Sequence, residues 1–468
     1  MEAIVGDRPR HHRGHAGGRP KGLEHLDAPT LDRLRVLTQS LLAASADADG
    51  EYSRFLEIQH RSLGLPGEDM HEWLGGKTVL VTGGTGCVGS MLMRQLASYR
   101  PRRLICLSRG VTGGWPRPDG AEFAQADVRD ARAVASVVGE IKPDVLFHVA
   151  AQRDPGLAEH EVHRTVTTNV LGVRNVIAAA ERVGVPLVVT ASTGKALRPY
   201  SPDVYTASKR VGEWVVSAGA ARGGTGTRFA SARFTHVVDN SIIHRRLQGW
   251  AADGGPMRLH STNILFYAQS ALESAQLLLC AGLGAHAGSL RVNALSDLGW
   301  PINLLDLALG VLRRTGSTTP VYFSGYDSGY EDVPFPGLYD PDTAGDVSPL
   351  LSALEADRAR PGACRAADSF VLAVAPEPGL DGMLLELEQA CERTQQPEAV
   401  RAALDTLSWA MFDATLRAAP ARVLARAALL TAPHRGRLNP QHLRMLDAFE
   451  RYAAQASPGR ARPDPVLR

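Results

Sequence analysis

The sequence predicts an α/β protein built on a doubly wound parallel sheet, with helical extensions at both ends. Two observations predict the sheet: short β-branched segments alternate with helical segments from about residue 77, and a glycine-rich turn follows the first strand. A third observation predicts the extensions, because apolar residues recur at three-to-four spacing before residue 75 and after about residue 348.

Composition narrows the classes of protein that this chain can be. A chain of 468 residues exceeds one ordinary hydrophobic core, so we expect a large domain with appendages. Charged residues make up 21% and hydrophobic residues 44%, which is typical of a soluble globular enzyme. The net charge of +2 argues against a nucleic acid as the main partner.

The cysteines and the hydropathy pattern bear on location. The five cysteines are scattered without C-x-x-C spacing, so they predict neither a disulfide framework nor a metal site, and a reducing cytoplasm fits best. No apolar run reaches the roughly 18 to 20 residues of a membrane span, so no membrane interaction is expected.

Changes in composition predict five regions along the chain. The predicted regions are a basic disordered tail (1–25), a helical N-terminal extension (26–74), a nucleotide-binding domain (75–345) with a substrate-binding subdomain from about 235, a mainly helical C-terminal region (346–457) and a loose tail (458–468). The N-terminal extension contains two helices separated by the turn segment SADADG, and they would form a cap on the next domain.

The strands of the predicted domain are short β-branched runs. In order they are KTVLVTGG, RLICLSR, DVLFHVAA, LVVTAS and TRFASARF, each followed by a helical or turn segment. Ligands of such sheets bind outside the carboxyl ends of the strands, so we expect the functional residues there.

A glycine turn joins the first strand to the first helix. In VLVTGGTGCVGSMLMRQL, Gly83, Gly86 and Gly89 recur at three-residue spacing, which indicates a Rossmann-type dinucleotide site. Glycines here make the turn, admit a pyrophosphate close to the backbone and let the helix pack on the strand. The predicted cofactor turn comprises Gly83, Thr85, Gly86, Cys87, Val88 and Gly89.

The end of the second strand bears on the choice of cofactor. An acidic residue there would favour NAD, whereas this chain has Ser108 and Arg109, a hydroxyl and a guanidinium suited to a 2′-phosphate. We therefore predict NADP, with NAD as the alternative. The simpler interpretation is that Arg109 is a solvated strand end.

Further cofactor contacts are expected at the next strand ends. Asp127 and Val128 stand where a third strand would meet the adenine, and the small Ala150 and Ala151 would let the dinucleotide pass close to the backbone. Asn169, on the following helix, is either a supporting residue or a structural polar residue.

A Tyr-x-x-x-Lys pair follows the strand LVVTAS. Tyr205 and Lys209 are one helical turn apart and share a face, so the ammonium would lower the pKa of the phenol and hold the nicotinamide ribose. Tyr205 would then act as acid or base during hydride transfer, with Thr193 hydrogen-bonded to the same substrate oxygen. Such pairs occur by chance in many helices; the position after the glycine turn and this strand favours catalysis.

At these residues the chain resembles the extended short-chain dehydrogenase/reductases, specifically the capsular polysaccharide biosynthesis group of UDP-N-acetylglucosamine 4,6-dehydratases and nucleotide-sugar epimerases. The resemblance covers residues 75 to 330: STGKALRP is similar to the segment S-T-D-K-A-x-x-P, and YTASKRVGE to the helix Y-G-A-T-K-R-x-x-E. It implies an NAD(P)-dependent cytoplasmic enzyme, a nucleotide-sugar substrate and a homo-oligomer.

The departures from the group concern its catalytic acid and its substrate contacts. The Asp that supplies the acid for water loss is Gly194 here, whereas Lys195 remains as a base. His236 replaces a substrate-contacting Asn, and Asp327 replaces an Arg expected at the diphosphate, which a carboxylate would repel. The residues predicted to bind substrate are Gln152, His236, Asp239, Asn240 and Asp327.

Three functions compete. We favour an NADP-dependent oxidoreductase or epimerase of a nucleotide sugar, in which Tyr205 deprotonates a hydroxyl and Lys195 moves a neighbouring proton on carbon; a variant is a ketoreductase of a non-sugar, cationic metabolite. The second is a 4,6-dehydratase with a substituted acid. The third is a catalytically retired NADP-binding protein whose helices bind a partner, which the intact Tyr205 and Lys209 argue against.

The composition also bears on the source of the chain. Its few lysines and many arginines are typical of a protein from a GC-rich bacterial genome.

Overall fold

The computed structural model describes residues 27–45, 47–110, 118–223, 226–326, 349–372, 378–394 and 396–456. These residues divide into two compact units. The first unit contains residues 27–62, 235–274 and 298–326, and the second contains residues 63–234, 275–297 and those from 349 onward. The linear boundary expected after residue 74 is therefore replaced by one after Ser62, because the chain that follows packs with the sheet.

The second unit is built on a nine-stranded sheet in the order β14-β15-β11-β6-β5-β4-β1-β2-β3. Seven of the strands are parallel: β1 (Thr78–Thr82), β2 (Arg103–Ser108), β3 (Glu122–Gln125), β4 (Val145–His148), β5 (Leu187–Thr193), β6 (Arg228–Phe234) and β11 (Arg291–Leu295). This sheet confirms the predicted fold class. Its central strands are buried on both sides, as their continuous apolar runs require.

The C-terminal region adds two antiparallel strands to this sheet. β15 (Ala367–Val371) pairs with β11, and β14 (Arg360–Pro361) pairs with β15. The region expected to be mainly helical is therefore continuous with the nucleotide-binding sheet at this edge.

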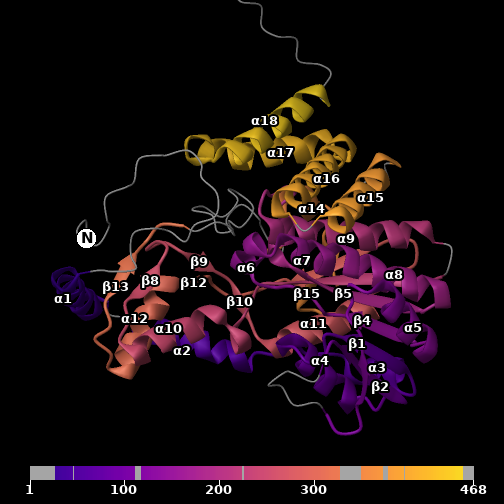
Figure 1. Ribbon diagram of the computed structural model, residues 1–468, viewed down its shortest axis with the longest axis horizontal. Coiled ribbons are helices and arrows are strands. Elements are labelled where there is room, and N and C mark those ends of the chain that lie inside the picture. The colour runs from indigo at the N-terminus through magenta and orange to yellow at the C-terminus, as the bar shows by residue number, and fades with distance from the viewer. Residues whose placement is uncertain are drawn as a thin grey trace, which may run out of the picture. The chain divides into compact units, whose positions relative to one another are not determined.

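Helices cover both faces of the sheet (Figure 1). On one face lie α5 (Ala131–Ile141), α8 (Gly172–Val183) and α9 (Val204–Arg222). On the other lie α4 (Cys87–Ser98) and α11 (Ala271–Leu283). On that second face Gly282 allows close packing, since a Cβ there would lie 2.5 Å from Trp73 and 3.2 Å from Val189.

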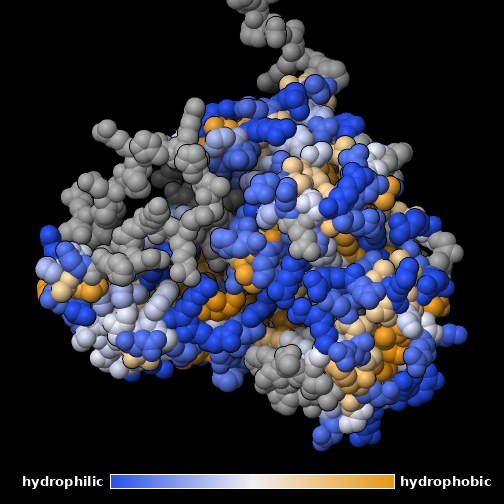
Figure 2. Space-filling view, in the orientation of Figure 1, coloured by the Kyte–Doolittle hydropathy of each residue, from blue (hydrophilic) through white to orange (hydrophobic). Residues whose placement is uncertain are grey.

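The C-terminal helices are α14 (Ala353–Ala356), α15 (Pro378–Arg393), α16 (Pro397–Ala418), α17 (Ala421–Thr431) and α18 (Pro440–Gln455). Apolar residues of α16, among them Leu404 and Met411, join the core beneath α8 and α9. Phe412 and Phe449 form a second core with Tyr200. With these faces buried, the visible surface of α17 and α18 is mostly hydrophilic (Figure 2).

The first unit has its own core. It contains α1 (Ala28–Ala44), α2 (Ala48–Glu57), α10 (Ile242–Asp253) and α12 (Leu304–Thr315), with three short strand pairs. Phe55 of α2 and Leu309 of α12 are fully buried in it. Within the ranges given above, no helix of either unit combines the length and apolar character needed to cross a membrane.

Candidate functional site

The glycine turn after β1 has the close contacts that the sequence predicted. Gly83 has a φ of +72°, and a Cβ there would lie 2.7 Å from the backbone nitrogen of Ala150. A Cβ on Gly89 would lie 2.2 Å from the carbonyl oxygen of Gly83. The Gly86 N–H donates to that same carbonyl at 3.0 Å. The turn is thus sterically closed to larger residues and leads directly into α4, whose N-terminus carries the positive end of the helix dipole.

The remaining residues of the predicted cofactor turn lie around this bend. Cys87 is buried at the first position of α4, Thr85 and Val88 are half-buried, and Gly86 is exposed. Ala150 and Ala151 follow β4 and are half-buried and exposed respectively. The small Ala150 is what permits contact between the β4 end and the Gly83 backbone.

The ends of β2 and β3 carry the residues predicted at the adenosine end. Ser108 donates its hydroxyl to the Gly110 carbonyl at 2.7 Å, and Arg109 is exposed. Asp127 forms an ion pair with Arg129 at 2.6 Å, and this hydrogen bond lowers its pKa, with a small contribution from Arg109. The Arg109 guanidinium therefore lies close enough to Asp127 to interact with its charge. Val128 is buried against Gly172.

Asn169 joins the segment after β4 to α9. It lies in a π-helical turn, η2 (Thr167–Leu171), and is buried. Its amide accepts from the Gln152 N–H at 2.9 Å and donates to the Gln152 carbonyl at 3.0 Å and to the Ser208 hydroxyl at 3.1 Å. The Gln152 side chain bonds to the backbone of Asp154. Both amides are therefore used to hold the backbone.

Tyr205, Thr193 and Lys209 lie together at the carboxyl edge of the sheet. Asp203 caps α9 by accepting the Thr206 N–H at 2.7 Å, which places Tyr205 in the first turn of the helix. Thr193 ends β5 and hydrogen-bonds to the Tyr205 phenol. The Lys209 ammonium donates to the Ala191 carbonyl at 2.8 Å. The structure thus brings together the three residues that the spacing predicted.

Opposing effects act on the proton of Tyr205. Burial is the largest effect and raises the pKa of the phenol above its usual value, although the hydrogen bond from Thr193 lowers it in part. The prediction that this pKa is lowered by the Lys209 ammonium is therefore wrong for this structure, because burial outweighs the lowering effects. Among nearby charges, Asp203 and Asp154 raise this pKa and Arg153 lowers it. Arg153 was not among the predicted site residues; its position directly after the β4 motif was the available signal.

Lys209 is poised to change charge near neutral pH. Burial lowers the pKa of its ammonium to about 8, against an opposing effect of Glu213. Burial and the Lys209 charge together lower the pKa of His148 to about 3, so this imidazole is neutral and bonded to Thr82 at 2.8 Å.

Gly194 and Lys195 begin the short turn η3 (Gly194–Leu197) after β5. Burial raises the pKa of Asp203, but the charges of Lys195 and Arg198 outweigh that effect and lower it. A Cβ on Gly194 would lie 2.6 Å from Cδ2 of Leu350. The apolar side chain of Leu350 thus occupies the space in which the similar dehydratases are expected to have their catalytic Asp.

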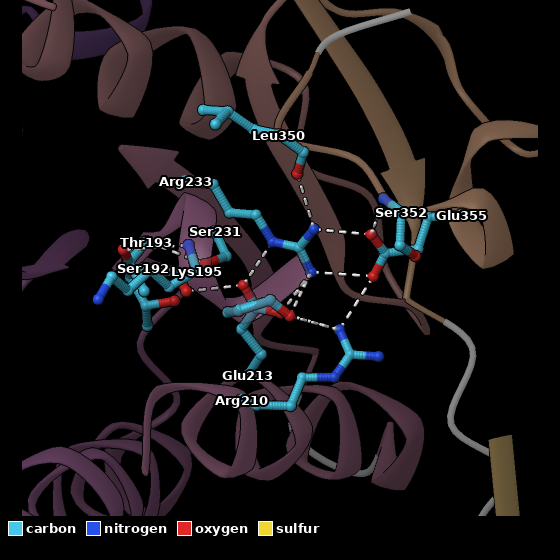
Figure 3. A network of polar contacts seen from close by, with 12 residues as sticks. Ser192, Thr193, Lys195, Arg210, Glu213, Ser231, Arg233, Leu350, Ser352 and Glu355 are labelled. Atoms are coloured by element: carbon cyan, nitrogen blue, oxygen red, sulfur yellow. Dashed lines mark hydrogen bonds and ion pairs between the residues drawn. The ribbon is translucent and has the colours of Figure 1, made fainter. Parts of the chain in front are cut away.

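Four charged side chains lie behind the end of β5, and sequence reasoning missed them (Figure 3). They are Arg210 and Glu213 of α9, Arg233 of β6 and Glu355 of α14. Arg210 and Glu213 belong to the segment YTASKRVGE, and Arg233 stands in an apolar strand where a charge requires a partner. Glu355, distant in sequence, had no comparable signal.

Three predicted substrate residues lie in the first unit, in β7 (His236–Val237) and η4 (Val238–Asn240). His236 bonds to the Ser241 hydroxyl at 2.7 Å, Asp239 accepts the Ala271 N–H at 2.7 Å, and Asn240 accepts from Arg245 at 2.7 Å. Each side chain thus has a partner within the unit. Asp327 lies outside the described residues.

Comparisons with known proteins agree with this architecture. The family model described as "Polysaccharide biosynthesis protein" matches residues 79–329. The chain is 30% identical to the capsular polysaccharide biosynthesis protein CapD of Staphylococcus aureus over 56% of its own length and 45% of that protein. It is 29% identical to the probable polysaccharide biosynthesis protein EpsC of Bacillus subtilis, over 55% and 45%.

Two further proteins are similar to this chain over a shorter stretch or at lower sequence identity. The chain is 30% identical to a UDP-N-acetylglucosamine 4,6-dehydratase (inverting) of Campylobacter jejuni, over 35% of its length and 50% of that protein. Among solved structures, Pen from Bacillus thuringiensis superposes with a TM-score of 0.54 at 20% identity, over 65% of this chain and 89% of that one, which supports the fold. The chain thus spans about half the length of the curated relatives it matches. It belongs to the polysaccharide biosynthesis protein family and is an extended short-chain dehydrogenase/reductase of the capsular polysaccharide type.

Proposed function

We propose that the chain is an NAD(P)-dependent oxidoreductase or epimerase that acts on a nucleotide sugar through a transient ketone. The observation that carries this proposal is the contact of Thr193 with Tyr205, one helical turn from Lys209. These residues lie at the carboxyl edge of the same sheet that bears the glycine turn. The dehydratase among the relatives, named for UDP-N-acetylglucosamine, supports a nucleotide sugar as the substrate class.

The residues present fit a nicotinamide dinucleotide. Gly83 and Gly89 leave no room for side chains, so the backbone N–H groups of the turn and of the α4 N-terminus would face the pyrophosphate. Exposed Arg109 would bind a 2′-phosphate, which favours NADP over NAD. When bound, the cofactor would supply the hydride chemistry at the substrate carbon.

The chain's own residues would move the protons. Tyr205 takes the proton of the substrate hydroxyl as the carbon is oxidised, and it returns a proton when the ketone is reduced. Thr193 orients the same oxygen by a hydrogen bond. Protonated Lys209 stabilises the phenolate through its charge. Lys195 would remove or return a proton on the carbon next to the ketone.

Gly194 favours this reaction over loss of water. Glycine has no proton to give, and Leu350 occupies the adjacent space. A 4,6-dehydratase therefore needs an acid from elsewhere. The ionised Asp203 is unsuited, since its pKa is lowered. The dehydratase remains the second candidate because of the likeness to such an enzyme over 170 residues.

Reactions with UDP-N-acetylglucosamine and related nucleotide sugars in heavy water test the proposal. Epimerisation predicts a product of altered chromatographic retention, with deuterium incorporated at the carbon that Lys195 serves. Loss of one water mass would show a dehydratase instead. Absence of any product, with NADPH binding retained, would refute a nucleotide sugar as substrate and favour the reductase of a non-sugar metabolite.

A further inference from the structure

The buried charges behind β5 form one connected network (Figure 3). The Arg233 guanidinium has no exposed surface and lies between two carboxylates. It donates to Glu213 at 2.8 Å through both Nε and Nη2, and to Glu355 at 2.7 and 2.9 Å. Arg210 donates to Glu355 at 2.9 Å and lies 3.4 Å from Glu213. Two positive and two negative charges thus balance.

This network is attached to the reaction centre at two elements. Glu213 lies on α9 one helical turn after Lys209, on the same face of the helix. Its Oε1 atom accepts the hydroxyl of Ser192, the residue before Thr193, at 2.6 Å. The position of the Glu213 carboxylate therefore sets how the end of β5 meets α9, and with it the contact of Thr193 with Tyr205.

The C-terminal region supplies the other half of the network. Glu355 closes a capping box with Ser352 at the start of α14, which fixes its carboxylate. The Leu350 carbonyl accepts from Arg233 at 3.0 Å, and the Leu350 side chain fills the space beside Gly194. Residues 350–355 thus contact both the network and the turn that follows Thr193.

We propose that Glu355 is a positioning residue of the reaction centre: through Arg233 and Glu213 it fixes Ser192 and Thr193 against Tyr205, so the C-terminal region completes the site. The inference rests on the proposed function for its link to turnover. The charge balance does not depend on that function and can be measured separately.

Removing the Glu355 charge changes the field at Lys209. Glu355 is ionised at working pH because, although burial raises its pKa, Arg233 and Arg210 lower it to about 2. The variant Glu355→Gln leaves a net positive charge on the network, which offsets the attraction of Glu213 for the Lys209 ammonium. The other charged or titratable groups near this centre are His148 of β4, Arg153, Asp154, Lys195, Arg198, Asp203 and Tyr205. The variant leaves them unchanged.

Titration of Lys209 by nuclear magnetic resonance tests the charge balance without any assay of activity. The chain has five lysines, so labelling with lysine that carries carbon-13 at Cε gives few signals. The signal that disappears in Lys209→Arg is that of Lys209. Glu355→Gln should lower the Lys209 pKa, and Glu386→Gln, at an exposed carboxylate of α15, should not. An unchanged Lys209 pKa in folded Glu355→Gln would overturn the proposal.

A second variant tests positioning and covers the case in which Glu355→Gln does not fold. Glu355→Asp keeps the charge but shortens the reach, so the Lys209 pKa should stay near its original value. The kcat should fall by about 10- to 100-fold, as expected for displaced catalytic groups, with KM changing little. Undiminished kcat in this variant would exclude positioning. If the unaltered protein turns over no nucleotide sugar, the proposed function fails, while the lysine titration still decides the charge balance.

Discussion

At the reaction centre, Lys209 has a pKa within the ordinary working range of pH. Its pKa is lowered from 10.5 to about 8, chiefly by burial. In the reaction that we propose, protonated Lys209 stabilises the phenolate of Tyr205 as the substrate hydroxyl loses its proton, so the residue would support catalysis while it is charged. The two side chains therefore act together, and the pH dependence of turnover reports on both.

The pH profile gives the first prediction. As pH rises through about 8, Lys209 loses its proton, so kcat for oxidation of the substrate hydroxyl should fall above this value. In Lys209→Arg the cation persists at all accessible pH, and this falling limb should disappear even though the absolute rate is lower. Steady-state kinetics from pH 6 to about pH 10 measure both enzymes. A limb that persists in Lys209→Arg would assign it to another group.

Arg109 decides between the two cofactors at the scale of one side chain. Loss of a charge-assisted bond to a 2′-phosphate should weaken NADPH binding in Arg109→Ala by about 10- to 100-fold and leave NADH binding nearly unchanged. Fluorescence titration of the reduced cofactors measures both affinities. Arg132→Ala, at an exposed arginine of α5, is the matched control. Equal weakening of the two cofactors in Arg109→Ala would contradict the NADP assignment.

At the scale of elements, the turn after β5 shows why a motif departure is not an isolated substitution. Gly194 is tolerated because Leu350, brought in by the C-terminal region, fills the space that a side chain would take. Leu350 is buried, with 1% of its surface exposed, so it has little freedom to move aside.

An Asp introduced at position 194 should therefore not act as a catalytic acid while Leu350 fills the space beside it. Gly194→Asp should lower the thermal unfolding midpoint and should not create a dehydratase, because the carboxylate meets an apolar, buried neighbour. Adding Leu350→Ala should recover part of the lost stability, so the two changes should be non-additive. Thermal unfolding of both single variants and the double variant gives the coupling. Additive losses would show that Leu350 does not constrain residue 194.

The sequence predicted the elements whose chemistry is local. The turn of Gly83, Gly86 and Gly89 and the pair Tyr205 and Lys209 each lie within one strand–helix connection, so their spacing was informative. The place of Glu355 in the network could not be predicted, since its arginine partners lie more than 100 residues away and meet it only in the tertiary fold. Asn169 shows an intermediate case: its polarity was noticeable, but its partners Gln152 and Ser208 were not.

At the scale of the whole molecule, long-range contacts decided what the sequence left open. The strand β15 lies between two segments that contain proline and glycine, RPG before it and PEPG after it, and has no clear alternation, so its pairing with β11 was not predicted. The two units are discontinuous in sequence, because the chain leaves the sheet after Phe234 and returns from Ala275. Linear changes in composition cannot reveal such a return.

The C-terminal region also contributes to stability in acid. Glu355 has its pKa lowered from 4.5 to about 2, so the folded state binds its proton less readily than the unfolded chain. The stability it provides is fully present above pH 4.5 and is lost as pH falls towards 2. Urea unfolding across this range should show a shallower pH dependence in Glu355→Gln, because this variant has no carboxyl group at position 355 to titrate. An unchanged slope would contradict the assignment of that loss to Glu355.

In the proposed reaction, Tyr205 takes the proton of the substrate hydroxyl while hydride passes to the cofactor. The most direct measurement is the absorbance of reduced cofactor formed in a single turnover, with a nucleotide sugar and NADP, for the unaltered protein and for Tyr205→Phe. Reduced cofactor should form in the unaltered protein and not in the variant, whose NADPH affinity should stay within a few-fold. Equal formation of reduced cofactor in both proteins would exclude Tyr205 as the group that takes the substrate proton.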